Sequence, residues 1–415
     1  MKTILYLHGA SNPVKHRRIL DGMRRFAKMV AWDVVSAEID GMSKAAVKEL
    51  VLEHGASGCV LDAVGSRSGW NSRPFVPNVP VVLIDPEYAT RRNASDVLLC
   101  DNAAIANAAF RELSAGHPPS FAAVTYWNPL RRWARERVAA FRAICSESQC
   151  DCAVFPARGI EAPEVRSARL ADWAAALPKN VAIFAVNDFT AVETAIALHS
   201  RHRPIPKTAT LVGVDGSPER HDIPPSPVAI TSVDVNFESA GFLAARMLAE
   251  ILSRGGAERQ RDTSHITSSS AFSAPPREKS HVGFGPLMVE RRESTRGRGR
   301  REWFILEAAE TIRREACDGL TAAMLAARFP VSRKHFERRF REAIGHSVLD
   351  EILNIRLENV TAYLLRRDIA IDTIAGRCGF GSEIELRRLF RRRFGMSMTA
   401  WRARNSVWGN ALQND

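Results

Sequence analysis

The stretch SRKHFERRFREAIG at Ser332–Gly345 returns in the same pattern as SEIELRRLFRRRFG at Ser382–Gly395, 50 residues later. Both copies hold a serine, a bulky apolar residue, Arg, Phe, Arg and a closing Gly in the same register. Short apolar stretches precede the two copies, at Leu320–Phe329 and at Ile369–Phe380. The sequence therefore predicts a helix, a tight turn and a second helix, and it uses this unit twice.

The second helix of each unit is predicted to have one buried face and one cationic face. Ser332 and Ser382 stand where an N-cap belongs, so each helix is expected to begin there. Apolar residues recur at the four-residue spacing of a buried face, at Phe336, Phe340 and Ile344 and at Leu386, Phe390 and Phe394. The opposite faces carry Arg333, Lys334, Glu337, Arg338 and Arg341 in the first copy, and Glu383, Arg387, Arg388, Arg391 and Arg392 in the second.

A cationic helix face of this kind suits the phosphates and base edges of a DNA major groove. A solvated face is the alternative for any single run of charges, but here repeat, cap, apolar face and charge agree. Between the copies, Leu349–Arg366 is apolar at helical spacing, and a helix of that length spans about 27 Å. Major-groove faces on one side of a duplex repeat every ~34 Å, so one chain could offer two reading helices to one side of the DNA.

These residues resemble the DNA-binding domain of the AraC/XylS transcription regulators over Leu320–Arg402. The residues in family register are Ala375, Cys378-Gly379-Phe380, Phe390, Phe394-Gly395 and Trp401-Arg402. Val348 and Met398 stand where the family usually has proline. The resemblance implies a two-part major-groove reader. With Arg333 from the cationic face, the candidate DNA-contacting residues are Arg333, Lys334, Glu337, Arg338, Glu383, Ile384, Arg387 and Arg388.

Length and charge are consistent with this reader occupying one end of a larger protein. A chain of 415 residues predicts two or three domains. The net charge is +12, and the residues from Arg296 onward hold 23 Lys and Arg against 15 Asp and Glu. An electrostatic footprint for nucleic acid is therefore confined to the C-terminal part.

Cysteine usage and hydropathy indicate a reduced, cytoplasmic protein. The seven cysteines are an odd number scattered among apolar neighbours. Cys150 and Cys152 could bind a metal, but no second pair or histidine completes a site, so we expect no metal. The apolar run within Met1–Gly9 is too short for a signal peptide, and no stretch approaches the ~20 apolar residues of a membrane span.

The first 250 residues or so alternate short apolar strands with helices, which predicts parallel sheets flanked by helices. A first series runs from a strand at Ile4–Leu7 to one at Val97–Leu99, and a second series begins with a strand at Phe121–Tyr126. We therefore expect two α/β lobes with a cleft between them. Ligands of such sheets sit at the carboxyl ends of the strands. The candidate ligand-binding residues there are Asn12, Asp101, Arg137, Asn187, Asp188 and Asp215. Singly, each could instead be a helix cap or turn residue.

A second resemblance covers Met1 to about Leu252, which is similar to the effector-binding domain of the LacI/GalR regulators. The matching stretches are Arg137–Phe141, Leu177-Pro178, Asn187-Asp188, Ile205-Pro206, Val212–Asp215, Ile230–Val233 and Gly241. In that family the arginine, the Asn-Asp pair and the aspartate after Gly-x commonly bind ligand hydroxyls. The resemblance implies this role for Arg137, Asn187, Asp188 and Asp215.

The predicted domains are an effector-binding pair of lobes at 1–254, a segment at 255–301 and a double helix-turn-helix domain at 302–405. The middle segment holds a Ser-, Arg- and Pro-rich insertion at Gly255–Ser280, a returning strand at Leu287–Arg291 and a basic linker at Arg296–Arg301. The linker either contacts phosphates or is a solvated spacer.

This order of domains resembles the regulators of sugar operons, with pentose (xylose-like) catabolism as the nearest case. It implies a sugar-responsive activator that works as a homodimer on double-stranded DNA and contacts RNA polymerase. An enzyme is the competing class, but the sequence has no Gly-x-Gly-x-x-Gly after a strand, no Walker pattern and no Gly-x-Ser-x-Gly elbow. A ligand-independent architectural DNA binder is the other alternative, and the polar residues at the strand ends argue against it.

Overall fold

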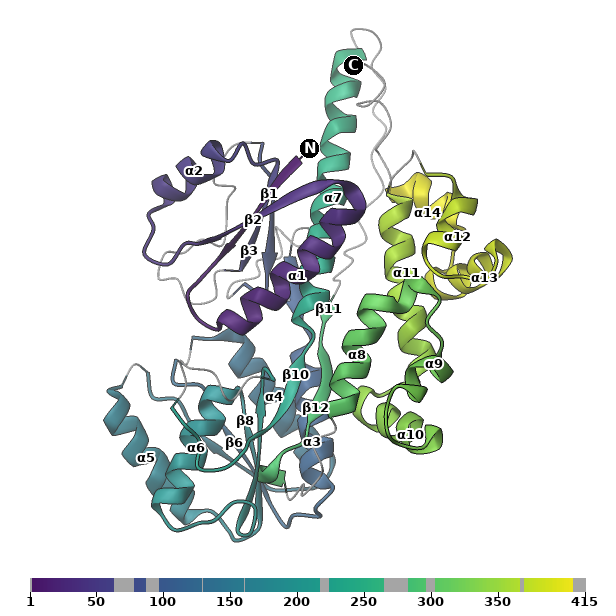
Figure 1. The fold of residues 1–415 in the computed structure, drawn as a ribbon. Helices are drawn as coiled ribbons and strands as arrows, with labels where there is room; N and C mark the ends of the chain where they lie inside the picture. The colour runs from purple at the N-terminus through teal and green to yellow at the C-terminus, as the bar shows by residue number, and fades with distance from the viewer. Residues whose placement is uncertain are drawn as a thin grey trace.

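The computed structural model describes residues 2–62, 78–86, 97–128, 130–159, 161–216, 224–264, 283–295, 303–365 and 369–405. They form a domain of two α/β lobes, called here the two-lobed domain, and a helical domain that lies beside it (Figure 1). The predicted fold class is therefore confirmed. Within the described ranges, no helix combines the length and apolar character that crossing a membrane requires.

The first lobe is built on a six-stranded parallel sheet in the order β11-β5-β4-β3-β1-β2. Its strands are β1 Lys2–His8, β2 Trp32–Glu38, β3 Gly58–Asp62, β4 Val81–Ile84, β5 Val97–Cys100 and β11 Gly283–Phe284. Its helices are α1 Pro13–Val30, α2 Lys44–Glu53 and α7 Phe237–Ser264.

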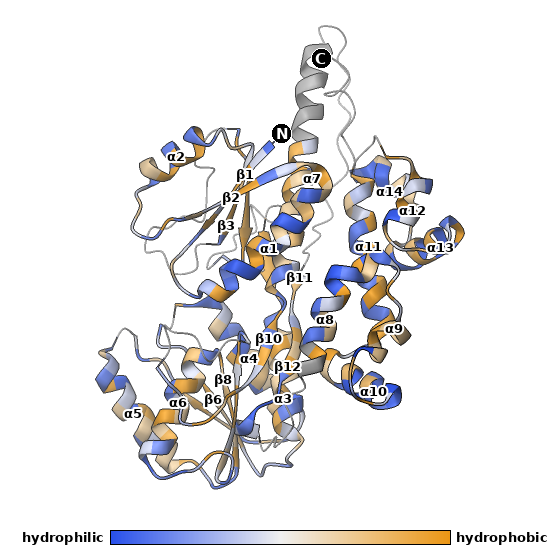
Figure 2. Cartoon of the chain, viewed as in Figure 1, coloured by the Kyte–Doolittle hydropathy of each residue, from blue (hydrophilic) through white to orange (hydrophobic). Residues whose placement is uncertain are grey.

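The second lobe has a six-stranded sheet in the order β12-β10-β9-β8-β6-β7, in which only the edge strand β12 is antiparallel. Its strands are β6 Phe121–Val124, β7 Cys152–Phe155, β8 Val181–Ala185, β9 Ala209–Val214, β10 Thr231–Val235 and β12 Pro286–Glu290. Its helices are α3 Asn102–Ser114, α4 Arg132–Glu147, α5 Pro163–Ala176 and α6 Asp188–Ser200. The central strands are continuous apolar runs because helices cover both faces of the sheet, and Figure 2 shows them as hydrophobic.

The chain passes between the lobes three times, from β5 to α3, from β10 to α7 and from β11 to β12. Hydrogen bonds join these crossings to one another. The Asp101 N–H donates to Phe284 O at 2.6 Å, and the Asn236 N–H donates to Gly285 O at 3.0 Å. The three crossings therefore lie side by side, where they can act as a hinge between the lobes.

The helical domain repeats one unit twice around a central helix, as the sequence predicts. Its helices are α8 Trp303–Glu315, α9 Ala322–Ala327, α10 Arg333–Ile344, α11 Val348–Leu364, α12 Ile371–Arg377, α13 Glu383–Phe394 and α14 Met398–Asn405. The Ser332 hydroxyl accepts from the His335 N–H and the Ser382 hydroxyl accepts from the Glu385 N–H, so both predicted N-caps are present.

The helices that follow each unit begin at Val348 and Met398, the positions where related domains usually have proline. The Ser347 hydroxyl accepts from the Asp350 N–H, and the Asp350 carboxylate accepts from the Ser347 N–H, which completes a capping box at the start of α11. The Ser397 hydroxyl likewise accepts from the Ala400 N–H. Serine capping therefore sets both helix starts without the fixed φ of a proline.

His346, next to this cap, is expected to make the stability of the helical domain depend on pH. Its Nε2 lies 2.7 Å from Glu351 Oε2, and this hydrogen bond raises the pKa of His346 above its ordinary 6.5, against a smaller effect of burial. A raised pKa in the folded state gives stability that is fully present below pH 6.5 and is lost as pH rises through the folded-state pKa. We expect the melting temperature to fall over that window in the wild type, and to fall less in His346→Gln and Glu351→Gln. Equal pH dependence in all three proteins would contradict this.

Helix α7 departs from the sequence-based expectation. The predicted insertion starts at Gly255, but α7 continues through Gly255 and Gly256 to Ser264. The expected boundary after Arg254 therefore falls inside a helix. The remainder of the insertion and the basic linker Arg296–Arg301 lie outside the described residues.

Candidate functional site

Helices α10 and α13 carry the charged faces expected of DNA-reading helices. Their inner sides hold Phe336, Phe340, Leu386 and Phe390, which are fully buried, so their other faces point to solvent. Figure 2 shows α10 as a largely hydrophilic helix. Ile384 on α13 is 81% exposed, and an apolar side chain that stands this far out can contact a thymine methyl group.

The candidate DNA-contacting residues fall into paired and unpaired groups. Arg333, Arg338 and Arg387 are held by glutamates of their own helices, Glu337, Glu342 and Glu383, with N–O distances of 2.7, 2.8 and 2.5 Å. Lys334 and Arg388 are exposed and form no side-chain bond within the described ranges. Because they give up no internal partner, these two side chains are the best placed to reach DNA.

Replacing Arg388 by alanine should weaken DNA binding by about 1–3 kcal/mol and relax base preference at one position, if Arg388 contacts a base edge. Arg391 lies one turn further along α13 and is expected on the backbone side, so Arg391→Ala should weaken binding to all sequences alike. Selection from a randomised duplex library reports the base preference, and titration of the selected duplex measures the loss of affinity. The same unchanged consensus for both variants would contradict this division of roles.

Among the strand-end candidates, the structure brings Arg137 and Asp215 together. Arg137 is only 4% exposed, and its Nη1 donates to Val186 O at 2.7 Å and lies 3.6 Å from Asp215 Oδ1. Its Nε donates to Asn102 Oδ1 at 3.0 Å, and its guanidinium lies over the Trp133 ring at 5.0 Å. A buried cation, a carboxylate and an amide thus meet where β8 and β9 end and α3 begins. These three side chains, of Arg137, Asp215 and Asn102, are called here the group around Arg137.

Three candidates act as helix caps, which is the alternative that the sequence left open. The side chains of Asn12, Asp101 and Asn187 accept from the N–H groups of Lys15, Ala104 and Thr190. Asp188 is fully buried and accepts from the Ser232 hydroxyl at 2.6 Å, so it lies inside the second lobe.

Sequence reasoning missed the bridge that ties the two lobes together. Arg132 of α4 donates to the Asp85 carboxylate after β4, and its Nε donates to Pro86 O at 3.1 Å. Glu136 accepts from Arg132 at 2.6 Å and from Asn102 Nδ2 at 2.8 Å, so the bridge joins the group around Arg137. Burial raises the pKa of Asp85 even though Arg132 lies beside it. No local signal distinguishes Arg132 from its neighbours in the sequence.

A second cross-lobe pair and a buried cluster lie at the strand ends of the first lobe. Arg18 of α1 reaches Asp234 of β10, with Nη1 2.5 Å from Oδ1. Lys15 Nζ lies 2.8 Å from Asp62 Oδ1. Burial alone would raise the pKa of Asp62, but Lys15 and His16 outweigh it and hold that pKa well below its usual range. Lys15 and Arg18, near the start of α1, are therefore both paired with acidic partners.

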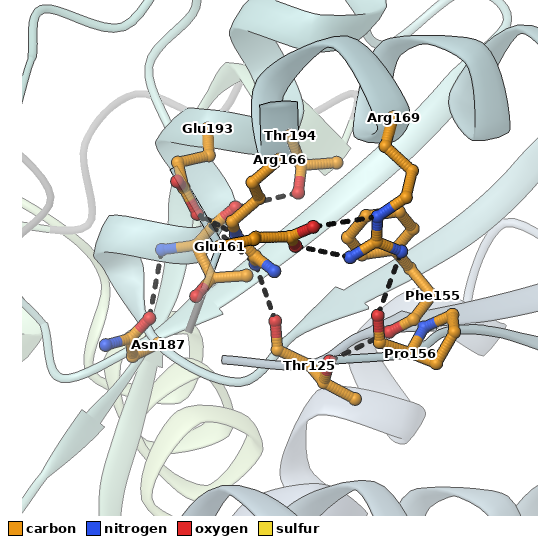
Figure 3. Close-up of polar contacts among 10 residues, drawn as sticks. Thr125, Phe155, Pro156, Glu161, Arg166, Arg169, Asn187, Glu193 and Thr194 are labelled. Carbon is orange, nitrogen blue, oxygen red and sulfur yellow. Dashed lines mark hydrogen bonds and ion pairs between the residues drawn. The ribbon is translucent and has the colours of Figure 1, made fainter. Parts of the chain in front are cut away.

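The strand ends of the second lobe hold a further arginine that the sequence did not single out (Figure 3). Arg166 of α5 is 2% exposed, donates from Nη2 to Thr125 O at 2.8 Å and lies 3.4 Å from Glu193 Oε2. Its guanidinium lies over the Phe155 ring at 5.3 Å. Burial raises the pKa of Glu193, with Arg166 acting in the opposite direction. Arg166 thus fixes α5 and α6 against the ends of β6 and β7.

Comparison with known proteins gives both domains a family. Residues 325–404 match the helix-turn-helix domain family, and residues 110–269 match the periplasmic binding protein-like domain family. The xylose operon regulatory protein of Escherichia coli (strain K12) is 27% identical over 338 residues, which are 79% of this chain and 80% of that protein. The protein of the same name from Haemophilus influenzae is 22% identical over 66% of each chain.

Solved structures share the fold. The xylose-binding transcription activator xylR covers 98% of this chain and 99% of its own, with a TM-score of 0.51 and 22% identity. The transcriptional regulator CelR in complex with cellobiose covers 71% of this chain and 84% of its own, with a TM-score of 0.53 and 16% identity. The first match extends over both domains, and the second covers a smaller share of the chain.

Proposed function

We propose that this chain, which joins a periplasmic-binding-protein-like domain to an AraC-type helix-turn-helix domain, is a DNA-binding transcription regulator that controls a sugar-catabolic operon. It responds to a small sugar bound between its lobes. The proposal extends to a pentose such as xylose as the sugar and to activation as the sign of regulation. The names of the relatives support the first point, since they are xylose operon regulators, and activation is proposed from the resemblance to sugar-operon regulators alone.

The group around Arg137 is the observation that carries the proposal. Arg137, Asp215 and Asn102 offer a cation, a carboxylate and an amide within one small region. Sugars are recognised by such sets, because each hydroxyl both donates and accepts a hydrogen bond. Aromatic Trp133 lies against the same arginine, and an aromatic face suits the apolar side of a sugar ring.

The pairing of charges favours a neutral ligand over an acidic one. Lys15, Arg18, Arg132 and Arg137 each lie within 3.6 Å of a carboxylate, those of Asp62, Asp234, Asp85 and Asp215. A carboxylate or phosphate ligand would have to compete with these aspartates for the cations. A neutral polyhydroxyl ligand needs no such exchange.

The remaining parts of the proposal concern partners. Double-stranded DNA is the partner of the helical domain, and we propose that two copies of the chain act as a homodimer on paired sites. Contact with RNA polymerase would follow from activation. A cytoplasmic location is expected of a protein with these partners.

Calorimetric titration of the whole protein with a panel of pentoses and hexoses tests the proposal, with the corresponding sugar acids as controls. DNA affinity is measured in parallel by selection from random duplexes with and without each sugar. We expect one neutral sugar to bind and to change DNA affinity. DNA binding with no response to any sugar would favour the architectural alternative, and tighter binding of a sugar acid would contradict the argument from charge.

A further inference from the structure

The helical domain rests on the second lobe through an apolar contact. Leu287 and Met288 of β12 are 6% and 4% exposed, and they belong to the same buried cluster as residues of α8 and α10, Ile305, Ile312, Phe336 and Phe340. The edge strand of the two-lobed domain thus completes the core of the first helix-turn-helix unit. Figure 1 shows α8 and α10 beside β12.

The same helical domain also rests on the first lobe. Ala362 and Leu365 at the end of α11 are buried in the large apolar cluster that contains Phe26 of α1 and Leu248 of α7. Arg246 of α7 donates to the Thr361 hydroxyl at 3.3 Å. The helical domain therefore contacts each lobe, and these two contacts are called here its footings; the three chain crossings lie between the lobes.

A set of charged residues lies along the contact with the first lobe. Glu238, in the first turn of α7, lies 3.6 Å from Arg25 of α1 and 3.7 Å from Arg313 of α8. Arg25 also lies 3.6 Å from Glu358 of α11. We call these four residues, Arg25, Glu238, Arg313 and Glu358, the charged seam.

The charged seam is incompletely satisfied in this conformation. Its ion pairs, at 3.6–3.7 Å, exceed hydrogen-bond distance. Arg25 Nε and Nη1, Arg313 Nη2 and Glu358 Oε2 are buried atoms with no hydrogen-bond partner in the described part of the chain. Burial raises the pKa of Glu358 although the arginines act against it. Buried charges without hydrogen bonds cost stability, so the charged seam weakens a contact that Ala362, Leu365 and the Arg246–Thr361 hydrogen bond otherwise hold.

We propose that the charged seam is a releasable contact through which movement of the lobes reaches the helix-turn-helix units. When the angle between the lobes changes, the distance between the two footings changes as well. A helical domain that keeps its shape cannot then stay in contact with both lobes. The footing on β12 is part of the apolar core of the helical domain, so it is expected to stay in place. The contact at the charged seam is then the one that breaks. The proposal rests on the proposed function for its trigger, a ligand between the lobes.

Two conservative variants of the full chain test the seam. Glu358→Gln keeps the shape of the side chain and removes its charge, and Arg25→Met keeps an apolar stem against the Phe242 ring that Arg25 covers. Glu315→Gln is the matched control, because the partners of Glu315, Arg314 and Arg328, both lie in the helical domain.

Hydrogen exchange without ligand is the first measurement, since it needs no sugar. Both seam variants should exchange several-fold faster than the wild type in α11 and in the C-terminal half of α1, and Glu315→Gln should not. Unchanged exchange in both would overturn the proposal.

The second measurement is the change of DNA affinity caused by a sugar that binds the wild type. In the seam variants sugar should still bind, but its effect on DNA affinity should be largely lost, because coupling is a property of the link between sites. Faster exchange with wild-type coupling would overturn the proposal. Failure of every sugar to bind the wild type would refute the proposed function instead, and the exchange result would still decide whether the seam is releasable.

Discussion

Gly241→Ala should destabilise the two-lobed domain severely. A Cβ at position 241 would lie 1.9 Å from Ile19 O, and one at Gly22, on the facing helix, would lie 1.9 Å from Glu238 O. Both obstacles are backbone atoms, so no side-chain rotation relieves them and α1 must move away from α7. Overpacking of a core costs about 1–3 kcal/mol when side chains can adjust, and we expect a loss at or above the top of that range.

The loss can be measured as a lowered midpoint of urea unfolding, followed by a signal from the two-lobed domain. Gly376→Ala is the matched control, because a Cβ there meets no atom within 4 Å and the residue lies in helix α12. That change should leave stability unchanged or raise it by up to about 1 kcal/mol. A wild-type midpoint for Gly241→Ala would mean that α1 and α7 do not cross this closely.

The helical domain could be predicted closely because its signals are local. A serine cap, a four-residue apolar spacing and a closing glycine lie within 14 residues of each other, and each copy checks the other. Gly345 and Gly395 end α10 and α13 with φ of 91° and 71°, which only glycine adopts readily. The parallel sheets could be predicted for the same reason, because short apolar strands that alternate with helices are also a local signal.

The bridges between lobes and domains could not be predicted, because their partners are far apart in sequence. Arg132 and Asp85 are 47 residues apart, and Arg246 and Thr361 are 115 apart. Charged residues are common in this chain, so the sequence offers many equivalent pairs and no way to choose among them. The position of the strand-end candidates at the carboxyl edge of each sheet could be predicted for a different reason, because parallel strands end at the same edge. Which of them cap helices depends on where each helix begins, and Arg137 and Asp215 emerge as a pair only in three dimensions.

Asp215→Asn should abolish the response to the sugar while leaving DNA binding without sugar unchanged. Asp215 directly follows β9 and lies 3.6 Å from Arg137, where its carboxylate can accept hydrogen bonds from adjacent hydroxyls. Hydrogen bonds to a charged group are worth about 1.5–3 kcal/mol each, and 1.4 kcal/mol is a factor of ten in affinity. Sugar binding should therefore weaken at least tenfold. Asparagine is preferred to alanine because Asp215 has a φ of 106°, and asparagine tolerates positive φ better.

The response should fail because a ligand shifts a population only by its differential affinity for the two states. The alternative role of Asp215 is to form the turn after β9. On that view, the asparagine variant would melt at a lower temperature and would still bind the sugar with wild-type affinity. Asp172→Asn is the control, because Asp172 lies in the same lobe, is 71% exposed and pairs with Arg201. Calorimetry on folded protein decides between the two roles: an affinity equal to that of the wild type and of Asp172→Asn would remove Asp215 from the site.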